Sequence, residues 1–525
     1  MPNIIVPGRE SDHALKVSVI DIGFNSIKMV NYEVGRRKLI RVCGEFGIKT
    51  RLGEGLVKRR TFAPAAVKRT VDALEICREI IRAESIRHAI TVGTSPFREA
   101  ENRDEFLRLI FQKTGFRIRV LSSGEEALYS LFGAMLSTGR KTSLFFDLGG
   151  GSLEIVYLKN FRIRRLLSLP LGSLRLTELY AGRDGNFTEK NYSRMEKHIT
   201  ESLPDRNELG LSADAALVGV GGTVRALARY DQEKSGYPFD KIHNFTVRSS
   251  SIEKAKHRFS RTPVKKLQNI QSFGEGRAST VTAGSAVVAI LMKKLGLKEL
   301  VVSTHGLRDG ILTSFISGHL YHDKDADLVA SIERHLKSAQ EAPTLRKSDQ
   351  MIRAFEDNGA INSSESLILT HLVRNGIDRE PASSPEFLFY KLMGEDCTLS
   401  PGHQLVLALS AVRCRNARAS DRLLVRYGKL LSEEERGSIS KIASCQKFID
   451  LIEKGCSAVN IKADRCAINI RVYPGVRFPE KLFKRTARNV RNNLVPPLRI
   501  TVIGLAPGLS GRNIYGMPRE EREPQ

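Results

Sequence analysis

The sequence predicts an α/β fold made of two similar lobes, followed by a mainly helical region with a small β-containing end. Three observations support this prediction. A strand–turn–strand unit occurs twice, strands alternate with amphipathic helices over roughly the first 320 residues, and helical patterns dominate from about Asp323. Strand–helix alternation is typical of a mainly parallel sheet covered by helices.

The repeated unit is a hairpin with a glycine turn. The segment DIGFNSIKMV, which begins at Asp21, aligns without a gap over DLGGGSLEIV, which begins at Asp147. Gly and Asp are common in turns, so a chance match is the alternative. Identical register across strand, turn and strand favours a duplicated unit. Two such lobes would face a shared cleft, with the N–H groups of both turns directed at one phosphate chain.

The other elements follow in order along the chain. Apolar and β-branched runs predict strands at 89–93, 117–121, 215–220 and 299–303, and apolar residues near period 3.6 predict helices at 63–83, 102–114, 124–135 and 283–295. The expected domains are lobe I at 14–136, lobe II at 137–320, a helical domain at 321–455, a small α+β region at 456–507 and a polar tail at 508–525.

Composition limits the function classes. Lys and Arg number 83 against 58 Asp and Glu, a net charge of +25, which favours a polyanionic partner, although basic surfaces can also serve solubility alone. No nucleic-acid-binding motif is present, so no specific nucleic acid is expected. Seven scattered Cys without a CxxC pair, no signal peptide and no long apolar run predict a cytoplasmic protein without a transmembrane segment.

Glycine-rich segments carry the candidate phosphate sites. Gly149, Gly150, Gly151 and Ser152 can present backbone N–H groups and a hydroxyl to phosphate, because glycine allows positive φ and close approach. The flanking Asp147 and Glu154 can hold a divalent cation such as Mg²⁺. A second loop of the same type is formed by Gly221, Gly222 and Thr223. A plain glycine-rich hairpin is the structural alternative.

Two further segments carry ionisable side chains. Thr94, Ser95 and Arg98 follow a strand and can clamp a terminal phosphate, although a turn with a surface arginine has the same pattern. Glu125 and Glu126 lie where a helix begins. Carboxylates there usually serve as caps, and the alternative is that one acts as general base on an attacking water.

Six segments together resemble the exopolyphosphatase and pppGpp-phosphatase family, of the sugar kinase, Hsp70 and actin superfamily: 21–26, 94–98, 123–127, 147–154, 221–223 and 306–310. The resemblance implies a ribonuclease-H-like (actin-like ATPase) core and an enzyme that hydrolyses phosphoric anhydrides. It implies Glu126 as catalytic base, Arg98 as terminal-phosphate contact, and Asp21 and Asn25 as members of the first phosphate turn. Inorganic polyphosphate is the expected substrate, pppGpp the alternative, and a homodimer the implied assembly.

The sequence departs from the family pattern at three positions. Phe24 replaces a small residue, Ser279 replaces an Asp, and His305 stands where another residue is commoner. A bulky Phe24 could narrow the cleft or turn outward against a neighbour. These departures leave a non-catalytic polyphosphate-binding protein as an alternative of another class. The helical domain is similar to HD phosphohydrolases but lacks their paired His-Asp motif, so we expect a substrate channel or dimerisation module there. A basic stripe at 481–491 would suit a long polyanion.

Overall fold

The computed structural model describes residues 15–35, 40–273, 277–318, 325–338, 347–375, 384–394, 398–463, 468–474, 480–494 and 498–502. The chain divides into two compact units, Met1–Glu341 and Ala342–Gln525. The tail expected at 508–525 lies outside the described residues.

The first sheet belongs to lobe I and has the strand order β3-β2-β1-β4-β5. Its strands are β1 (Leu15–Ile22), β2 (Ile27–Val34), β3 (Ile40–Ile48), β4 (His88–Gly93) and β5 (Arg119–Val120). Its helices are α1 (Leu56–Arg59), α2 (Pro64–Ala83), α3 (Ser95–Glu99), α4 (Arg103–Thr114) and α5 (Ser123–Thr138).

The second sheet belongs to lobe II and has the order β10-β11-β9-β6-β7-β8. Its strands are β6 (Ser143–Leu148), β7 (Leu153–Lys159), β8 (Arg162–Leu169), β9 (Ala216–Val220), β10 (Thr246–Arg248) and β11 (Glu299–Val302). The helices of this part are α6 (Ser173–Tyr180), α7 (Glu189–Ser202), α8 (Arg206–Leu209), α9 (Gly222–Ser235), α10 (Ser249–Ser260), α11 (Val264–Leu267), α12 (Ala278–Leu295), α13 (Leu307–Ile316) and α14 (Asp325–Ser338), with a 3₁₀ turn at Gln271–Phe273.

The expectation of mainly parallel sheets was wrong, because both sheets are mixed. In each lobe the hairpin strands pair antiparallel (β1–β2–β3 and β6–β7–β8), and parallel pairing begins on the other side of β1 and β6. The outer strands β3 and β8 were not predicted, since much of each is solvent-exposed and lacks the apolar signal of a buried strand. The equivalent pairing in both sheets supports the duplication inferred from the sequence.

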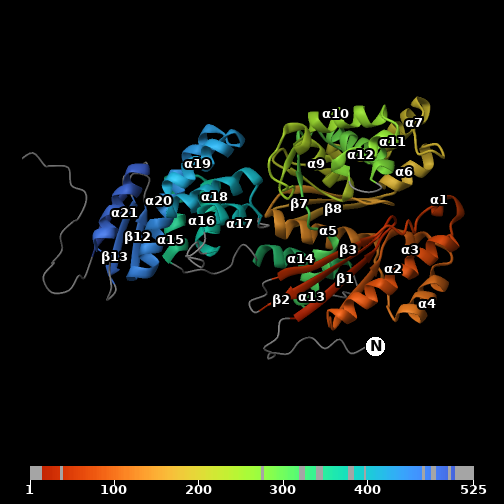
Figure 1. Ribbon diagram of the computed structural model, residues 1–525, viewed down its shortest axis with the longest axis horizontal. Helices are drawn as coiled ribbons and strands as arrows, with labels where there is room; N and C mark the ends of the chain where they lie inside the picture. The colour runs from red at the N-terminus through yellow and green to blue at the C-terminus, as the bar shows by residue number, and fades with distance from the viewer. Residues whose placement is uncertain are drawn as a thin grey trace, which may run out of the picture. The chain divides into compact units, whose positions relative to one another are not determined.

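Helix α5 lies between the two sheets (Figure 1), and α13 packs against it. α13 packs on α5 and on β1, while α5 packs on β6, β7 and β8. Apolar side chains from both sheets and both helices form one buried cluster there, which includes Val19, Leu128, Phe145 and Ile311. The N-terminal ends of these helices therefore have fixed positions relative to both hairpins.

One described helix, α12, is long and apolar enough to cross a membrane. Most of its surface is buried against α6, α7, α9 and α10, so it serves as the core helix of lobe II. Its apolar character follows from burial on nearly all sides.

The second unit contains a helical group and a small sheet. The helices are α15 (Lys347–Asp357), α16 (Ser363–Asn375), α17 (Pro385–Gly394), α18 (Pro401–Arg415), α19 (Ala417–Tyr427) and α20 (Glu433–Gly455), with a 3₁₀ turn at Gly428–Leu430. The sheet has the order β12-β13-β14, formed by β12 (Cys456–Ala463), β13 (Ile468–Pro474) and β14 (Leu498–Val502), and α21 (Glu480–Asn493) connects the last two strands. Strand β12 was not predicted as such.

Two expectations from the sequence concern the second unit: a basic stripe on a helix, and a helical domain without a paired His-Asp motif. Helix α21 buries Phe483, Ala487 and Val490. Of the predicted basic stripe, Lys481, Arg485 and Arg488 are exposed and Lys484 is half-buried. The described residues include no group of three or more His, Cys, Asp or Glu arranged to hold a metal. The roles proposed for this unit remain predictions.

Candidate active site

The two hairpin turns have the same local structure and touch each other. Gly23 donates its N–H to the carbonyl of Ser26, and Gly149 donates to that of Ser152, each over 3.0 Å. A Cβ built on Gly150 would lie 3.3 Å from the Cβ of Phe24 and 3.4 Å from that of Asn25. The two predicted phosphate turns therefore face each other across one cleft, as the duplication implied.

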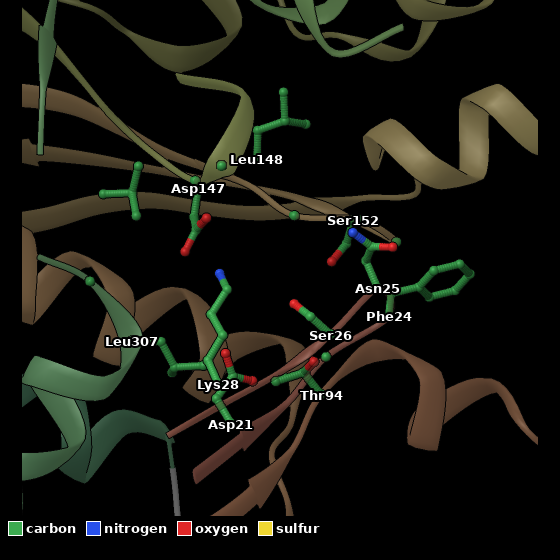
Figure 2. Close-up of a pocket in the computed structure, with 18 of the residues that line it drawn as sticks. Asp21, Phe24, Asn25, Ser26, Lys28, Thr94, Asp147, Leu148, Ser152 and Leu307 are labelled. Carbon is green, nitrogen blue, oxygen red and sulfur yellow. The ribbon is translucent and has the colours of Figure 1, made fainter. Parts of the chain in front are cut away.

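A solvent-open cavity of about 930 Å³ lies between the turns (Figure 2). Most of the predicted site residues line it: Asp21, Asn25, Thr94, Ser95, Glu126, Asp147, Gly149, Gly150, Gly151, Ser152, Gly221 and Gly222. They come together because Asp21 and Asp147 end parallel strands, and the segments after β4 and β9 begin at the same edge of each sheet.

The glycines act mainly through close approach. Gly149, Gly150 and Gly151 are not among the residues with positive φ, contrary to the expected use of that freedom. A Cβ on Gly151 would lie 2.4 Å from Ser95 Oγ, so this glycine lets lobe I approach the loop of lobe II. Gly221 does adopt a φ of 113°, and a Cβ there would meet the Leu148 carbonyl at 2.4 Å.

The two carboxylates at the start of α5 have different roles. Glu125 caps the helix: its carboxylate accepts from the backbone N–H of Ser122, its own backbone N–H donates to Ser122 Oγ, and its carboxylate pairs with Arg119. Glu126 instead lines the cavity. Glu125 therefore serves as the helix cap, while the role of Glu126 as base stays a prediction.

Glu126 is held by an arginine of lobe I. Arg98 Nη1 donates to Glu126 Oε2 at 2.8 Å and to the Leu121 carbonyl at 3.0 Å. Burial raises the pKa of Glu126 to about 7; Arg98 opposes the rise, while Asp21 and Asp147 add to it. A carboxyl group with this pKa exchanges protons near neutral pH, as a general base requires. Arg98 itself does not line the cavity.

Asp21 and Asp147 approach the cavity from opposite lobes. Asp147 Oδ2 accepts a hydrogen bond from Ser130, whereas Asp21 Oδ1 is buried without a hydrogen-bond partner among the described residues. Burial raises the pKa of Asp21, and Lys28 and Arg308 counter this rise. An unsatisfied buried carboxylate oxygen directed at a cleft can serve as a ligand for a cation or a hydrogen-bonded water.

Glu154 and Thr223 do not line the cavity. Glu154 lies opposite Asp147 across the β6–β7 ladder, but its residue is 1% exposed and its Oε1 accepts from Ser168 Oγ at 3.0 Å. Burial, followed by the charges of Glu126 and Asp147, raises its pKa well above the usual value. Thr223 is buried against Gly284. The metal role of Glu154 remains a prediction.

The cavity wall also carries a group of cations that was not predicted from the sequence: Lys28, Arg225, Arg277 and Arg308. Burial lowers the pKa of Lys28 to about 7, and Arg225 and Arg308 lower it further, against Asp21. Lys28 pairs with Asp21 across the β1–β2 ladder, as Glu154 pairs with Asp147. Lys28 occupies the position in the first hairpin that Glu154 occupies in the second. Alignment of the two hairpins could therefore have identified Lys28 as a candidate site residue.

Comparison with known proteins gives consistent matches. A family model described as the Ppx/GppA phosphatase family matches residues 32–319. "Exopolyphosphatase 2" of Mycobacterium tuberculosis is 31% identical over 315 residues, which is 57% of this chain and 98% of that protein. A bifunctional 3-dehydroquinate synthase/phosphatase of Fusobacterium nucleatum is 26% identical over 57% of this chain and 46% of its own length. An exopolyphosphatase structure from Cytophaga hutchinsonii has a TM-score of 0.54 at 21% identity, covering 58% and 98% of the two chains, and supports the fold.

Proposed function

Because the chain belongs to the Ppx/GppA phosphatase family, we propose that it releases terminal orthophosphate from inorganic polyphosphate. The observation that supports this most strongly is the position of Glu126. Its carboxylate lies in a cavity between two phosphate-type turns, with a pKa raised to about 7. A base, a phosphate cradle and a basic wall are the parts that hydrolysis of a phosphoric anhydride needs.

Each residue has a proposed part in the reaction. Glu126 orients a water and takes its proton as the water attacks the terminal phosphorus, and the shortened chain leaves in line. The N–H groups of the two turns, with Ser152, hold the phosphate oxygens. Arg98 contacts Glu126 rather than the cavity, so we assign it the role of holding the base.

The cavity residues fit a divalent cation shared with substrate. Mg²⁺ is usually bound by one or two carboxylates together with substrate phosphates and waters. Asp21 and Asp147 supply two such carboxylates, and Asp21 Oδ1 is free of hydrogen-bond partners among the described residues. The absence of a larger ligand cluster in the described part of the chain agrees with a shared site. The cation would offset phosphate charge, and these two aspartates would hold it.

The cavity wall favours a bare phosphate chain over a nucleotide. The cations Lys28, Arg225, Arg277 and Arg308 match a substrate that carries charge along its whole length. Phe24 is the only aromatic residue among the described lining residues, and its ring points away from the aspartates (Figure 2). A guanine base would therefore find no aromatic stacking partner on the described wall. This supports polyphosphate over pppGpp.

A substrate comparison tests the proposal. Orthophosphate release with Mg²⁺ is measured from long-chain polyphosphate, pppGpp and ATP at equal concentrations of phosphoanhydride bonds. The expected order places polyphosphate first. A higher kcat/KM for pppGpp would assign the enzyme to the alternative substrate. Binding of polyphosphate without release from any of the three would instead identify a non-catalytic binding protein.

A further inference from the structure

The Phe24 ring fills a space between the two lobes. It is 3% exposed and belongs to a buried cluster of lobe I that also contains Leu174 of lobe II. A Cβ on Gly53 would lie 2.3 Å from the ring, and one on Gly151 would lie 2.6 Å from it. The ring therefore needs a glycine on each side, one from each lobe. This outward orientation leaves the cavity itself open.

Phe24 is tied to its own lobe through the backbone. Its carbonyl accepts from the Gly53 N–H at 2.9 Å, and the carbonyl of Asn25 accepts from the Arg51 N–H at 3.0 Å. The turn of the first hairpin is therefore hydrogen-bonded to the 51–53 loop. Anything that fixes the ring against lobe II also fixes this turn.

Arg175 of α6 provides the contact from lobe II. Its guanidinium carbon is 5.5 Å from the centre of the Phe24 ring, and its Nε donates to the Gly151 carbonyl at 2.6 Å. Its Nη2 forms an ion pair with Glu99 of lobe I, and the arginine side chain is 10% exposed. We call Phe24, Arg175 and Glu99 the clasp. A desolvated cation–π contact and a largely buried ion pair hold more firmly than exposed ones.

We propose that the clasp sets the spacing of the two phosphate turns and that Phe24 and Arg175 are positioning residues for phosphoryl hydrolysis. This inference rests on the proposed function. Arg175 binds the carbonyl of Gly151 in one turn and covers the ring of Phe24 in the other. Without the ring, the turns lose the contact that holds Asn25 against Gly150. A displacement of about 1 Å in a catalytic arrangement can cost about 100-fold in rate.

Ordinary core packing would give a different result. Phe62 is a matched control, since it lies in the same buried cluster and its ring contacts Phe97 and Phe106, both in lobe I. If Phe24 were only core, truncation at either position would lower the melting temperature and leave kcat of the folded enzyme unchanged. If the clasp sets the spacing of the turns, truncation of Phe24 lowers kcat and truncation of Phe62 does not.

The experiment measures kcat and KM for long-chain polyphosphate with Mg²⁺, together with melting temperature. Phe24→Ser is expected to lower kcat by about 10- to 100-fold. Phe24→Leu, which keeps apolar bulk, is expected to retain kcat within about threefold. Phe62→Ala should lose melting temperature and keep kcat. If Phe24→Ser proves insoluble, Arg175→Gln must show the loss of kcat, and a normal kcat there overturns the proposal.

A double-mutant cycle adds a second readout. If Phe24 and Arg175 act together, the double variant Phe24→Ser/Arg175→Gln should lose little more kcat than the worse of the two single variants. Additive losses would overturn the coupling. A wild type that releases no phosphate defeats the proposed function and this inference together. An active wild type whose kcat survives Phe24→Ser defeats the clasp alone.

Discussion

Gly133 of α5 and Gly310 of α13 lie against each other where the two helices cross. A Cβ on Gly310 would lie 1.9 Å from the Tyr129 carbonyl, and one on Gly133 would lie 2.1 Å from the Gly306 carbonyl. The same helices carry Glu126 and Arg308 near their N-terminal ends. The crossing therefore sets the distance between the candidate base and one of the cavity cations.

Gly310→Ala should separate these helices. Because the added methyl meets backbone rather than a flexible side chain, we expect a loss of about 1–3 kcal/mol in the free energy of unfolding, together with reduced kcat. Gly437→Ala is the control, since Gly437 lies inside α20 with nothing within 4 Å. Alanine there should stabilise by about 1 kcal/mol and leave activity unchanged. Denaturant unfolding and phosphate release measure both, and equal stability in the two variants would contradict the tight crossing.

The charge of Arg98 sets the acidic limb of the pH profile. Glu126 acts as base only when deprotonated, so kcat/KM should fall as pH drops below about 7. Arg98 lowers the pKa of Glu126, so Arg98→Met should move this limb to higher pH. Arg119→Met, which removes the partner of Glu125, should leave it in place. A limb that does not move in Arg98→Met would show that Glu126 is not the group that titrates.

Lys28 should control the alkaline limb. With its pKa lowered to about 7, the amine is charged below that pH and loses its charge as pH rises through it. Substrate binding by the free enzyme should weaken accordingly, giving a bell-shaped kcat/KM profile. Lys28→Arg keeps the charge at every accessible pH and should flatten the alkaline limb. Lys28→Met should raise KM throughout, and an unchanged profile in both variants would exclude this role.

Asp147 and Glu154 should differ in how strongly their substitution changes the Mg²⁺ requirement. Chelation should abolish phosphate release, and added Mg²⁺ should restore it. Asp147→Asn should raise the Mg²⁺ concentration for half-maximal activity by about tenfold or more, because Asp147 lines the cavity. Glu154→Gln should shift it less, since Glu154 is buried and bonded to Ser168. A larger shift in Glu154→Gln than in Asp147→Asn would instead identify Glu154 as the stronger metal ligand of the two.

Local patterns in the sequence were enough to predict the hairpins and their turns. Asp21 and Asp147 could be placed because both precede glycine turns in the same register, and that register carries over to the pairs Asp21–Lys28 and Asp147–Glu154. The local pattern alone did not separate Glu125 from Glu126, and the choice of Glu126 as candidate base came from the family resemblance. Because Ser122 is the N-cap of α5, Glu125 falls at the position that completes the capping box. Glu126, one residue further along the helix, points in a different direction and reaches the cavity.

Contacts distant in sequence explain what was missed. Arg225 and Arg277 enter the cavity through the packing of α9 and α12, which no local pattern reports. Phe24 was expected either to narrow the cleft or to turn outward. The second outcome depends on Gly53 and Gly151 making room for its ring, and neither lies beside it in the chain.

Substitution of the two adjacent carboxylates is the most direct test of Glu126 as the base. Glu126→Gln and Glu125→Gln are compared with wild type for phosphate release from long-chain polyphosphate with Mg²⁺. Glu126→Gln is expected to lose about 10²- to 10⁴-fold in kcat while remaining folded. Glu125→Gln should keep most of its kcat and lose some stability, because Glu125 caps α5. Full activity in Glu126→Gln would show that Glu126 is not the base.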